Sequence, residues 1–377
     1  MRKIQMVDLK SQYDKIQQEI DTAVIDVIRS TQYINGSEVK NFQHDLENYL
    51  NVKHVIPCAN GTDALQVAMM GLDLKPGDEV ITTSFTFVAT VEVIALLGLT
   101  PVLVDVLPDT FNIDPESVRK AITSKTKAIV PVHLFGQCVD MEPLMEMGKE
   151  HNLYIIEDNA QAIGADYIFK DGTRKKAGTI GTVGCTSFFP SKNLGCYGDG
   201  GAIFTNDDEL AQRLRVIVNH GMEVRYYHDS IGVNSRLDSI QAAILRIKLR
   251  KLDEYAAARR KAACYYDRAF ANHPRIKTPV RSKFSSHVFH QYTLVIENLD
   301  QFALQKFMGE RDIPAMIYYP VPMHMQKAYI DPRYKEGDFP VTEMLSKSVI
   351  SLPMHTELDE EQLKYITESV LEFLGQN

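Results

Sequence analysis

The sequence lacks the features of a disulfide-rich or zinc-binding protein. Its 377 residues include five cysteines, an odd number, and no two of them form a Cys-x-x-Cys pair. We therefore expect neither a disulfide framework nor a metal site, and a reducing compartment fits this cysteine usage best. Internal repeats, low-complexity tracts and long linkers are also missing.

Long apolar runs and an excess of positive charge are absent as well. Residues 1–8 lack the apolar core of a signal peptide, and the apolar stretch 91–106 contains Glu92 and Pro101 and is too short to cross a bilayer. We expect a cytoplasmic protein with no membrane partner. The net charge of −8 argues against nucleic-acid binding, which needs clustered positive charge, so individual arginines must meet any anionic small substrate.

The first two-thirds of the chain alternate short apolar runs with amphipathic ones. This pattern is typical of an α/β protein with a mostly parallel sheet covered by helices on both faces. The predicted strands are 54–58, 79–84, 101–106, 128–133, 154–158, 186–189 and 202–205, and the helices between them include 86–97, 115–122, 141–151 and 208–219.

The chain is long enough for two domains. Apolar residues at helical spacing over residues 236–271 predict one long helix or two joined helices that leave the first domain. Later elements include strands at 291–296 and 317–320 and a closing helix at 360–374. We expect a large domain over residues 1–250 and a smaller C-terminal α/β domain over residues 251–377.

Two stretches of the large domain carry chemistry. Lys192 lies in a glycine-flanked turn five residues after Ser187, and the apolar strand 154–158 ends in Asp158. Taken singly, a loop lysine is usually a solvated charge, and an aspartate at a strand end is usually a cap. Together they indicate a pyridoxal phosphate site, in which a lysine forms a Schiff base and a carboxylate keeps the pyridine nitrogen protonated.

A third stretch supplies a place for the phosphate of that cofactor. The predicted strand 54–58 is followed by Asn60-Gly61-Thr62 and then by an apolar helical pattern. The free N–H groups and the dipole at a helix start favour an anion, although Asn-Gly-Thr could also be an ordinary turn. Because ligands of such sheets bind beyond the carboxyl ends of the strands, one crevice could collect Gly61, Thr62, residues 84–90, Asp158 and Gln161.

These residues resemble the pyridoxal phosphate-dependent nucleotide-sugar aminotransferases of the DegT group, and the resemblance covers essentially the whole chain. It rests on Tyr33-Ile34-Asn35-Gly36-Ser37-Glu38-Val39, Thr83-Ser84-Phe85-Thr86-Phe87-Val88-Ala89-Thr90, Glu157-Asp158-Asn159-Ala160-Gln161, Ser187-Phe188-Phe189-Pro190-Ser191-Lys192, Gly198-Asp199-Gly200-Gly201, Gly232-Val233-Asn234-Ser235-Arg236 and Tyr318-Tyr319-Pro320-Val321-Pro322-Met323-His324, besides the turn at Gly61. It implies the aminotransferase fold of type I, with a seven-stranded sheet in the large domain.

The resemblance also implies roles for single residues. Lys192 would bind the cofactor covalently and Asp158 would pair with the pyridine nitrogen, while Phe87 would stack on the ring. Gln161 would contact the phenolic oxygen. The phosphate would be held by Gly61, Thr62, Ser187 and, from a neighbouring subunit, Asn234, which makes the protein a homodimer with shared active sites.

Among the members of the group, this chain is most similar to enzymes that aminate a 3-keto nucleotide sugar, especially UDP-2-acetamido-3-keto-glucuronate. The implied product is an amino sugar for surface polysaccharide, with glutamate as amino donor and 2-oxoglutarate as by-product. Arg225 and, across the interface, Arg236 match the arginines that meet the acidic sugar. The chain has Tyr318-Tyr319 where those relatives have His-Tyr, and His324 stands at a position where those relatives have a different residue. Tyr318, Tyr319 and His324 are therefore the remaining candidates for substrate contacts.

Other interpretations stay open. The substrate could be a 4-keto sugar or a dTDP-linked 3-keto deoxysugar. A non-catalytic cofactor-binding regulator is a further alternative, although Lys192 and Asp158 are both present. A sugar dehydratase of the same fold is disfavoured by Lys192, because related dehydratases have histidine there.

Overall fold

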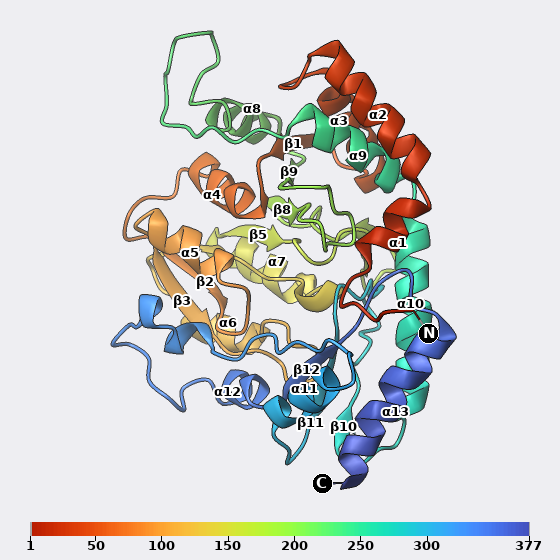
Figure 1. The fold of residues 1–377 in the computed structure, drawn as a ribbon. Helices are drawn as coiled ribbons and strands as arrows, with labels where there is room; N and C mark the ends of the chain where they lie inside the picture. Colours follow the sequence, from red (N-terminus) through yellow and green to blue (C-terminus); the bar gives the residue numbers. More distant parts are fainter. Residues whose placement is uncertain (1, 377) are drawn as a thin grey trace.

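The computed structural model describes residues 2–376, and its centre is a seven-stranded sheet (Figure 1). The strands across the sheet are β1 (His54–Cys58), β9 (Gly201–Thr205), β8 (Val183–Ser187), β5 (Tyr154–Asp158), β4 (Thr126–Ile129), β2 (Glu79–Thr83) and β3 (Thr100–Val104). Neighbours from β8 to β3 are parallel, whereas β9 is antiparallel to both β8 and β1. The predicted mostly parallel sheet is confirmed.

Helices cover both faces of this sheet. One face is packed by α4 (Gly61–Gly71), α5 (Ala89–Leu96) and α8 (Asp208–Ile217), and the other by α3 (Ser37–Leu50), α6 (Pro115–Ala121), α7 (Met141–His151) and α9 (Ser239–Leu249). Successive strand side chains point to opposite faces. Val80 of β2 thus packs with α4, while Ile81 packs with α7. Burial on both faces explains why consecutive residues of a strand, such as Val80 and Ile81, are both apolar.

Several predicted boundaries differ from the structure, among them those of β8, β4 and α5. β8 begins at Val183 rather than at residue 186, because Gly184, a residue depleted in strands, disguised its start. The regular β4 ladder ends at Ile129, since Pro131 has no N–H to donate. α5 begins three residues later than predicted, at Ala89. Thr86 and Phe87 are therefore free to line a cavity instead of continuing the helix.

The stretch 236–271, predicted to form one long helix or two joined helices, forms two helices. α9 ends at Leu249, and α10 (Leu252–Phe270) follows directly. The first half of α10 packs against the large sheet through Ala256, and its second half packs against the C-terminal strands through Tyr266 and Phe270. The proposed boundary near residue 250 coincides with the break between these helices.

The C-terminal part contains a three-stranded antiparallel sheet with helices beside it. Its strands are β10 (Ile276–Lys277), β11 (Tyr292–Ile296) and β12 (Val349–Leu352), and its helices are α11 (Gln301–Gly309), α12 (Pro340–Ser346) and α13 (Glu360–Gln376). Ile4, from the other end of the chain, packs into the same core. The division into domains 1–250 and 251–377 stays a prediction.

The predicted strand 317–320 is wrong. Only Met316 bridges to Ser351 on β12, and the chain then leaves the sheet edge so that Ile317, Tyr318, Tyr319 and Pro320 line the cavity described below. A proline, which cannot donate to a ladder, stands at the end of this segment.

The remaining elements are α1 (Leu9–Asp14), α2 (Gln17–Ser30), the hairpin of β6 (Asp166–Ile168) and β7 (Arg174–Lys176), and short turns of 3₁₀ helix, one of which is η1 (Leu134–Gly136). The segment that follows α8 extends away from the body of the molecule (Figure 1). Among residues 2–376, we find no helix with both the length and the apolar character needed to span a bilayer.

Candidate active site

A cavity of about 660 Å³ opens beyond the carboxyl ends of the central strands. Asp158 is the last residue of β5, Ser187 is the last of β8, and α4 begins just after β1. Nine of the residues predicted for the site line this cavity: Gly61, Thr62, Phe87, Asp158, Gln161, Ser187, Lys192, Tyr318 and Tyr319. Segments far apart in the sequence thus meet where the sheet topology places a ligand site.

Lys192 lies in the loop between β8 and β9. Its backbone N–H donates to the carbonyl oxygen of Phe189 at 2.8 Å, which closes a tight turn. Burial lowers the pKa of the Lys192 amine to about 8, and the negative charge of Asp158 opposes this shift. The unprotonated, nucleophilic amine therefore becomes the main form above about pH 8 instead of above the ordinary value of 10.5.

Asp158 is 5% exposed, and two donors hold its carboxylate. Thr90 Oγ1 donates to Oδ2 at 2.8 Å, and the backbone N–H of Ala160 donates to Oδ1 at 3.1 Å. Burial raises the pKa of Asp158, while these two hydrogen bonds and the charge of Lys192 act in the opposite direction. The carboxylate is directed into the cavity as a fixed anion that can pair with a cationic nitrogen.

The start of α4 forms a cradle for an anion. Asn60 Oδ1 accepts from the N–H of Asp63 at 2.8 Å, and this bond leaves the N–H groups of Gly61 and Thr62 as the open donors of the first turn. A Cβ atom at Gly61 would lie 2.6 Å from Ser187 Cβ, so only glycine leaves room between the helix start and this serine. A phosphate suits this cradle.

Aromatic side chains form a wall of the cavity. Phe87 is 55% exposed, so it is not a core residue, and its ring lies 6.4 Å from that of Tyr319. Gln161 Nε2 donates to the Tyr319 hydroxyl at 3.2 Å, while Gln161 Oε1 accepts from the N–H of Phe135 at 2.7 Å. A flat ring would find an exposed aromatic face and an orienting amide here.

The cavity therefore fits pyridoxal phosphate on its own chemistry. An amine of lowered pKa and a buried carboxylate face one space, and an anion cradle and an aromatic wall border it. The buried hydroxyl of Thr86, which also lines the cavity, has no hydrogen-bond partner among residues 2–376, as expected where a polar ligand supplies one.

Three of the other predicted residues lie in or next to the extended segment between α8 and α9. Arg225 and Asn234 are exposed, and the Arg225 guanidinium lies 4.9 Å from the ring of Tyr226. The backbone of Asn234 bridges to Asn219. Arg236 is half-buried. None of these three side chains lines the cavity of its own chain.

His324, the last predicted residue, lies outside the cavity in a buried position. Its Nδ1 is 2.7 Å from Ser84 Oγ and its Nε2 is 3.2 Å from Glu343 Oε1. With protein groups at both ring nitrogens, His324 is positioned to fasten the turn after Pro322 to the end of β2.

Sequence reasoning missed several groups that shape the site. Thr90 lies in the predicted segment 84–90 but was not predicted to contact Asp158. His290 also lines the cavity, and it comes from a distant segment with no local signal. Glu157, next to Asp158, points away from the cavity and is completely buried.

Four donors hold Glu157. Its two carboxylate oxygens accept from the N–H groups of Gly178, Ile180 and Gly181 at 2.6 to 2.8 Å, and Oε2 also lies 2.8 Å from His133 Nε2. His133 Nδ1 accepts from the N–H of Val139, so the ring can donate through Nε2. This network fixes the end of β5, and with it the direction of Asp158.

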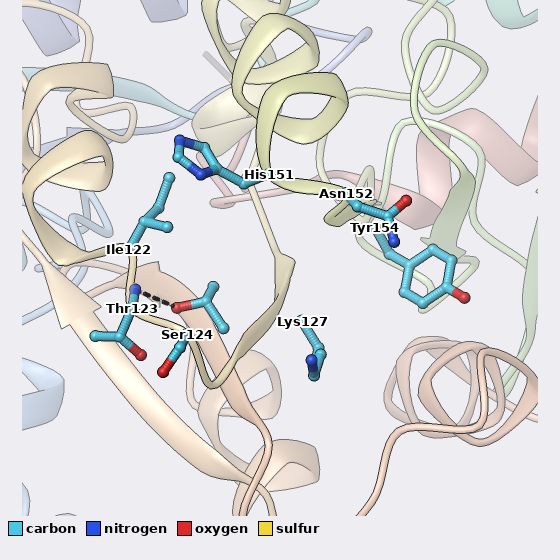
Figure 2. Close-up of a pocket in the computed structure, with 8 residues that line it drawn as sticks. Ile122, Thr123, Ser124, Lys127, His151, Asn152 and Tyr154 are labelled. Atoms are coloured by element: carbon cyan, nitrogen blue, oxygen red, sulfur yellow. Dashed lines mark hydrogen bonds between the residues drawn. The ribbon is translucent and has the colours of Figure 1, made fainter.

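A second cavity of about 490 Å³ lies at the opposite, amino ends of β4 and β5 (Figure 2). Figure 2 shows Lys127, His151 and Tyr154 around it, with a 2.9 Å hydrogen bond from the N–H of Thr123 to Thr126 Oγ1. No residue predicted for the site lies there, and parallel sheets bind ligands at their other edge.

Comparisons with known proteins agree with this geometry. The chain is 48% identical to a pleiotropic regulatory protein of Geobacillus stearothermophilus over 98% of both chains. It is 45% identical to the UDP-2-acetamido-2-deoxy-3-oxo-D-glucuronate aminotransferase of Pseudomonas aeruginosa, over 96% of this chain and 98% of the relative. The crystal structure of S. venezuelae DesV in complex with a ketimine intermediate superposes with a TM-score of 0.94 and 39% identity, covering 99% of each chain.

The family model described as the DegT/DnrJ/EryC1/StrS aminotransferase family matches residues 14–371. This match spans all seven strands of the large sheet and every residue of the cavity. The chain belongs to the DegT/DnrJ/EryC1/StrS aminotransferase family.

Proposed function

We propose that this protein is a pyridoxal phosphate-dependent aminotransferase that moves an amino group from glutamate to a keto nucleotide sugar. The observation that carries the proposal is the pairing of Lys192 and Asp158 in one cavity, where burial shifts the pKa of both groups and the charge of each group opposes the shift of the other. An isolated loop lysine would keep its usual pKa, and an aspartate serving only as a cap would not face it.

The cofactor, when bound, supplies an aldehyde for the lysine and an electron-withdrawing ring that stabilises negative charge on the adjacent carbon. Asp158 would hold the proton on the ring nitrogen, since its buried carboxylate is a counter-charge. Phe87 and Tyr319 would border the ring, and the start of α4 and Ser187 would hold the phosphate. Lys192 would bind the cofactor and, once its amine is free, would accept and return a proton at Nζ, as its pKa of about 8 permits.

The sugar that we propose is a 3-keto UDP-sugar such as UDP-2-acetamido-3-keto-glucuronate, whose aminated product would enter surface polysaccharide. The Pseudomonas aeruginosa relative with a substrate of this kind supports the choice. Arg225 is exposed, forms no ion pair with any of residues 2–376, and is the residue that we propose to meet the uronate. Tyr318 and Tyr319 in the cavity replace the His-Tyr of such relatives, so 4-keto and dTDP-linked 3-keto sugars are the competing substrates.

We further propose that two copies of the chain share their active sites. Arg225, Asn234 and Arg236 do not line the cavity of their own chain. They lie in the extended segment between α8 and α9 (residues 218–238), from which we propose that they reach the cavity of a second copy. This segment also exposes four large apolar side chains to solvent: Val224, Tyr226, Tyr227 and Ile231, of which Ile231 is 86% exposed. An apolar projection of this kind fits an interface better than a free surface.

Two measurements test the reaction. Borohydride reduction of the protein with pyridoxal phosphate, followed by peptide mapping, should locate the adduct on Lys192 and nowhere else. Incubation with glutamate and a panel of 3-keto and 4-keto sugars, linked to UDP or dTDP, should yield the amino sugar from one member. An adduct at another lysine would contradict the assignment of the site.

A non-catalytic regulator is the second candidate, because one relative of high identity is named a regulatory protein. Addition of glutamate alone separates the two. An aminotransferase would convert the yellow form of the bound cofactor to the colourless amine form and release 2-oxoglutarate in equal amount. A regulator would keep its absorbance.

A further inference from the structure

His290 lies between β10 and β11, in a segment whose backbone is held by hydrogen bonds from two side chains. Arg259, itself 2% exposed, donates through Nη1 to three carbonyl oxygens, including that of His290 at 3.3 Å. Asn193, the neighbour of Lys192, donates through Nδ2 to the carbonyl oxygen of Val288 at 3.0 Å. The segment is therefore tied directly to the loop that presents Lys192.

The ring of His290 is buried at the wall of the same cavity as Lys192. The residue is 5% exposed, and its Nδ1 has no hydrogen-bond partner among residues 2–376. Burial, together with the charges of Lys192 and then Arg259, lowers the pKa of His290 well below its usual value, so the ring is neutral. A neutral imidazole offers one acceptor nitrogen, and neighbouring cations favour turning that lone pair toward them.

Two donors could satisfy this nitrogen. One is Nε of Arg259, which also has no partner in the part of the chain described. Its guanidinium, however, is anchored by the three carbonyl contacts of Nη1. The other is the amine of Lys192, which ends a flexible side chain with three donors and faces open space in the cavity.

We propose that Nδ1 of His290 accepts a hydrogen bond from the Lys192 amine whenever this amine is not bonded to the cofactor, and so holds it in place between two proton transfers. His290 is then a positioning residue that acts through Lys192. The inference rests on the proposed function for the role of Lys192. Because an acceptor stabilises an ammonium group more than an amine, the contact also helps to set the pH at which Lys192 loses its proton.

The test compares the wild-type full chain with His290→Leu and His290→Asn, all freed of bound cofactor. The rate of reductive methylation of Lys192 with formaldehyde and cyanoborohydride is followed by mass spectrometry over a pH series around the midpoint of about 8. Leucine removes the acceptor, and we expect the midpoint to fall by about one pH unit. Asparagine offers an amide oxygen near the position of Nδ1 and should keep the midpoint close to that of the wild type.

The inference would be overturned if Lys192 methylation had the same pH midpoint in all three proteins, or if both variants shifted it equally. In that case Arg259 would be the donor to Nδ1 of His290. A measurement without a substitution at position 290 guards against misfolded variants. In the wild-type chain labelled with ¹⁵N-histidine and loaded with pyridoxamine phosphate, one neutral histidine should show an Nδ1 resonance that follows the titration of Lys192. This response should vanish in Lys192→Met, and its presence there would refute the contact.

Borohydride trapping of pyridoxal phosphate in the same proteins keeps the two ideas apart. Failure to trap Lys192 in the wild type would count against the proposed function. Successful trapping with unshifted midpoints would count against His290 alone.

Discussion

Thr90 Oγ1 donates a 2.8 Å hydrogen bond to Oδ2 of Asp158, and both groups are buried. The hydroxyl comes from the first turn of α5 and the carboxylate from the end of β5, so the bond joins two elements at the floor of the cavity. It favours the ionised form of a carboxyl group whose pKa burial raises. Thr90 therefore helps to keep the anion that the ring nitrogen needs.

Thr90→Val should reduce kcat by roughly 10-fold to 100-fold, because a hydrogen bond to a charged group contributes about 1.5–3 kcal/mol. Loss of this donor raises the pKa of Asp158 further, so that Asp158 is protonated, and loses its negative charge, at a higher pH than in the wild type. The acidic limb of the pH–rate profile should accordingly move to higher pH. Thr90→Ser keeps the hydroxyl and is the matched control; a serine variant as slow as the valine variant would point to packing instead.

The lowered pKa of Lys192 should be visible in the stability of the cofactor-free protein. The unfolded chain binds this proton with the ordinary pKa of 10.5, and the folded chain with a pKa of about 8. Below about pH 8 the amine is protonated in both states, and the folded state carries the whole cost of the buried charge, on the order of 3 kcal/mol. As the pH rises from the folded toward the unfolded pKa, this cost disappears and the wild type gains stability.

Urea unfolding of the wild type and Lys192→Met at several pH values measures this difference. The methionine variant should be the more stable of the two near neutral pH, and the gap should close on the alkaline side. A gap that does not change with pH would mean that the Lys192 amine is solvated in the free protein.

Gly61→Ala should weaken cofactor binding by on the order of 10-fold or more, since forced overpacking costs about 1–3 kcal/mol. The added Cβ would lie 2.6 Å from Ser187 Cβ, at the cradle for the phosphate. Absorbance titration with pyridoxal phosphate gives the affinity. Gly309→Ala, at the end of α11 with nothing within 4 Å of its new Cβ, is the control and should bind as the wild type does. Equal affinities in the two variants would remove Gly61 from the cradle.

The sequence revealed the two central groups because each stands at a recognisable chain position. Asp158 closes an apolar strand and Lys192 lies in a turn between two strands, and parallel topology then brings both to one edge. Thr90 and His290 could not be identified in this way. The role of Thr90 comes from a hydrogen bond across 68 residues of sequence to Asp158, and that of His290 from the proposed contact with Lys192. Similarly, the apolar segment 317–320 has the composition of a strand, but the edge of β12 engages only Met316.

Sharing of the active sites can be tested by mixing two inactive variants. Asn234→Asp places a carboxylate where the proposed partner phosphate would be repelled, and Lys192→Ala removes the reacting amine. If Asn234 acts across a twofold interface, a mixed dimer contains one site with Lys192 from one chain and Asn234 from the other. Random reassociation after mild dissociation should then restore about a quarter of the wild-type activity, because half of the dimers are mixed and each has one intact site.

Lys192→Ala mixed with Asp158→Asn is the control for this complementation. Both residues line the cavity of the same chain, so every site in that mixture lacks one of them and activity should stay at background. Restoration in the control would reveal exchange or contamination. No restoration in the first mixture, with mixed dimers demonstrated by native mass spectrometry, would show that Asn234 serves its own chain, and the extended segment would then have to fold back over its own cavity to deliver it.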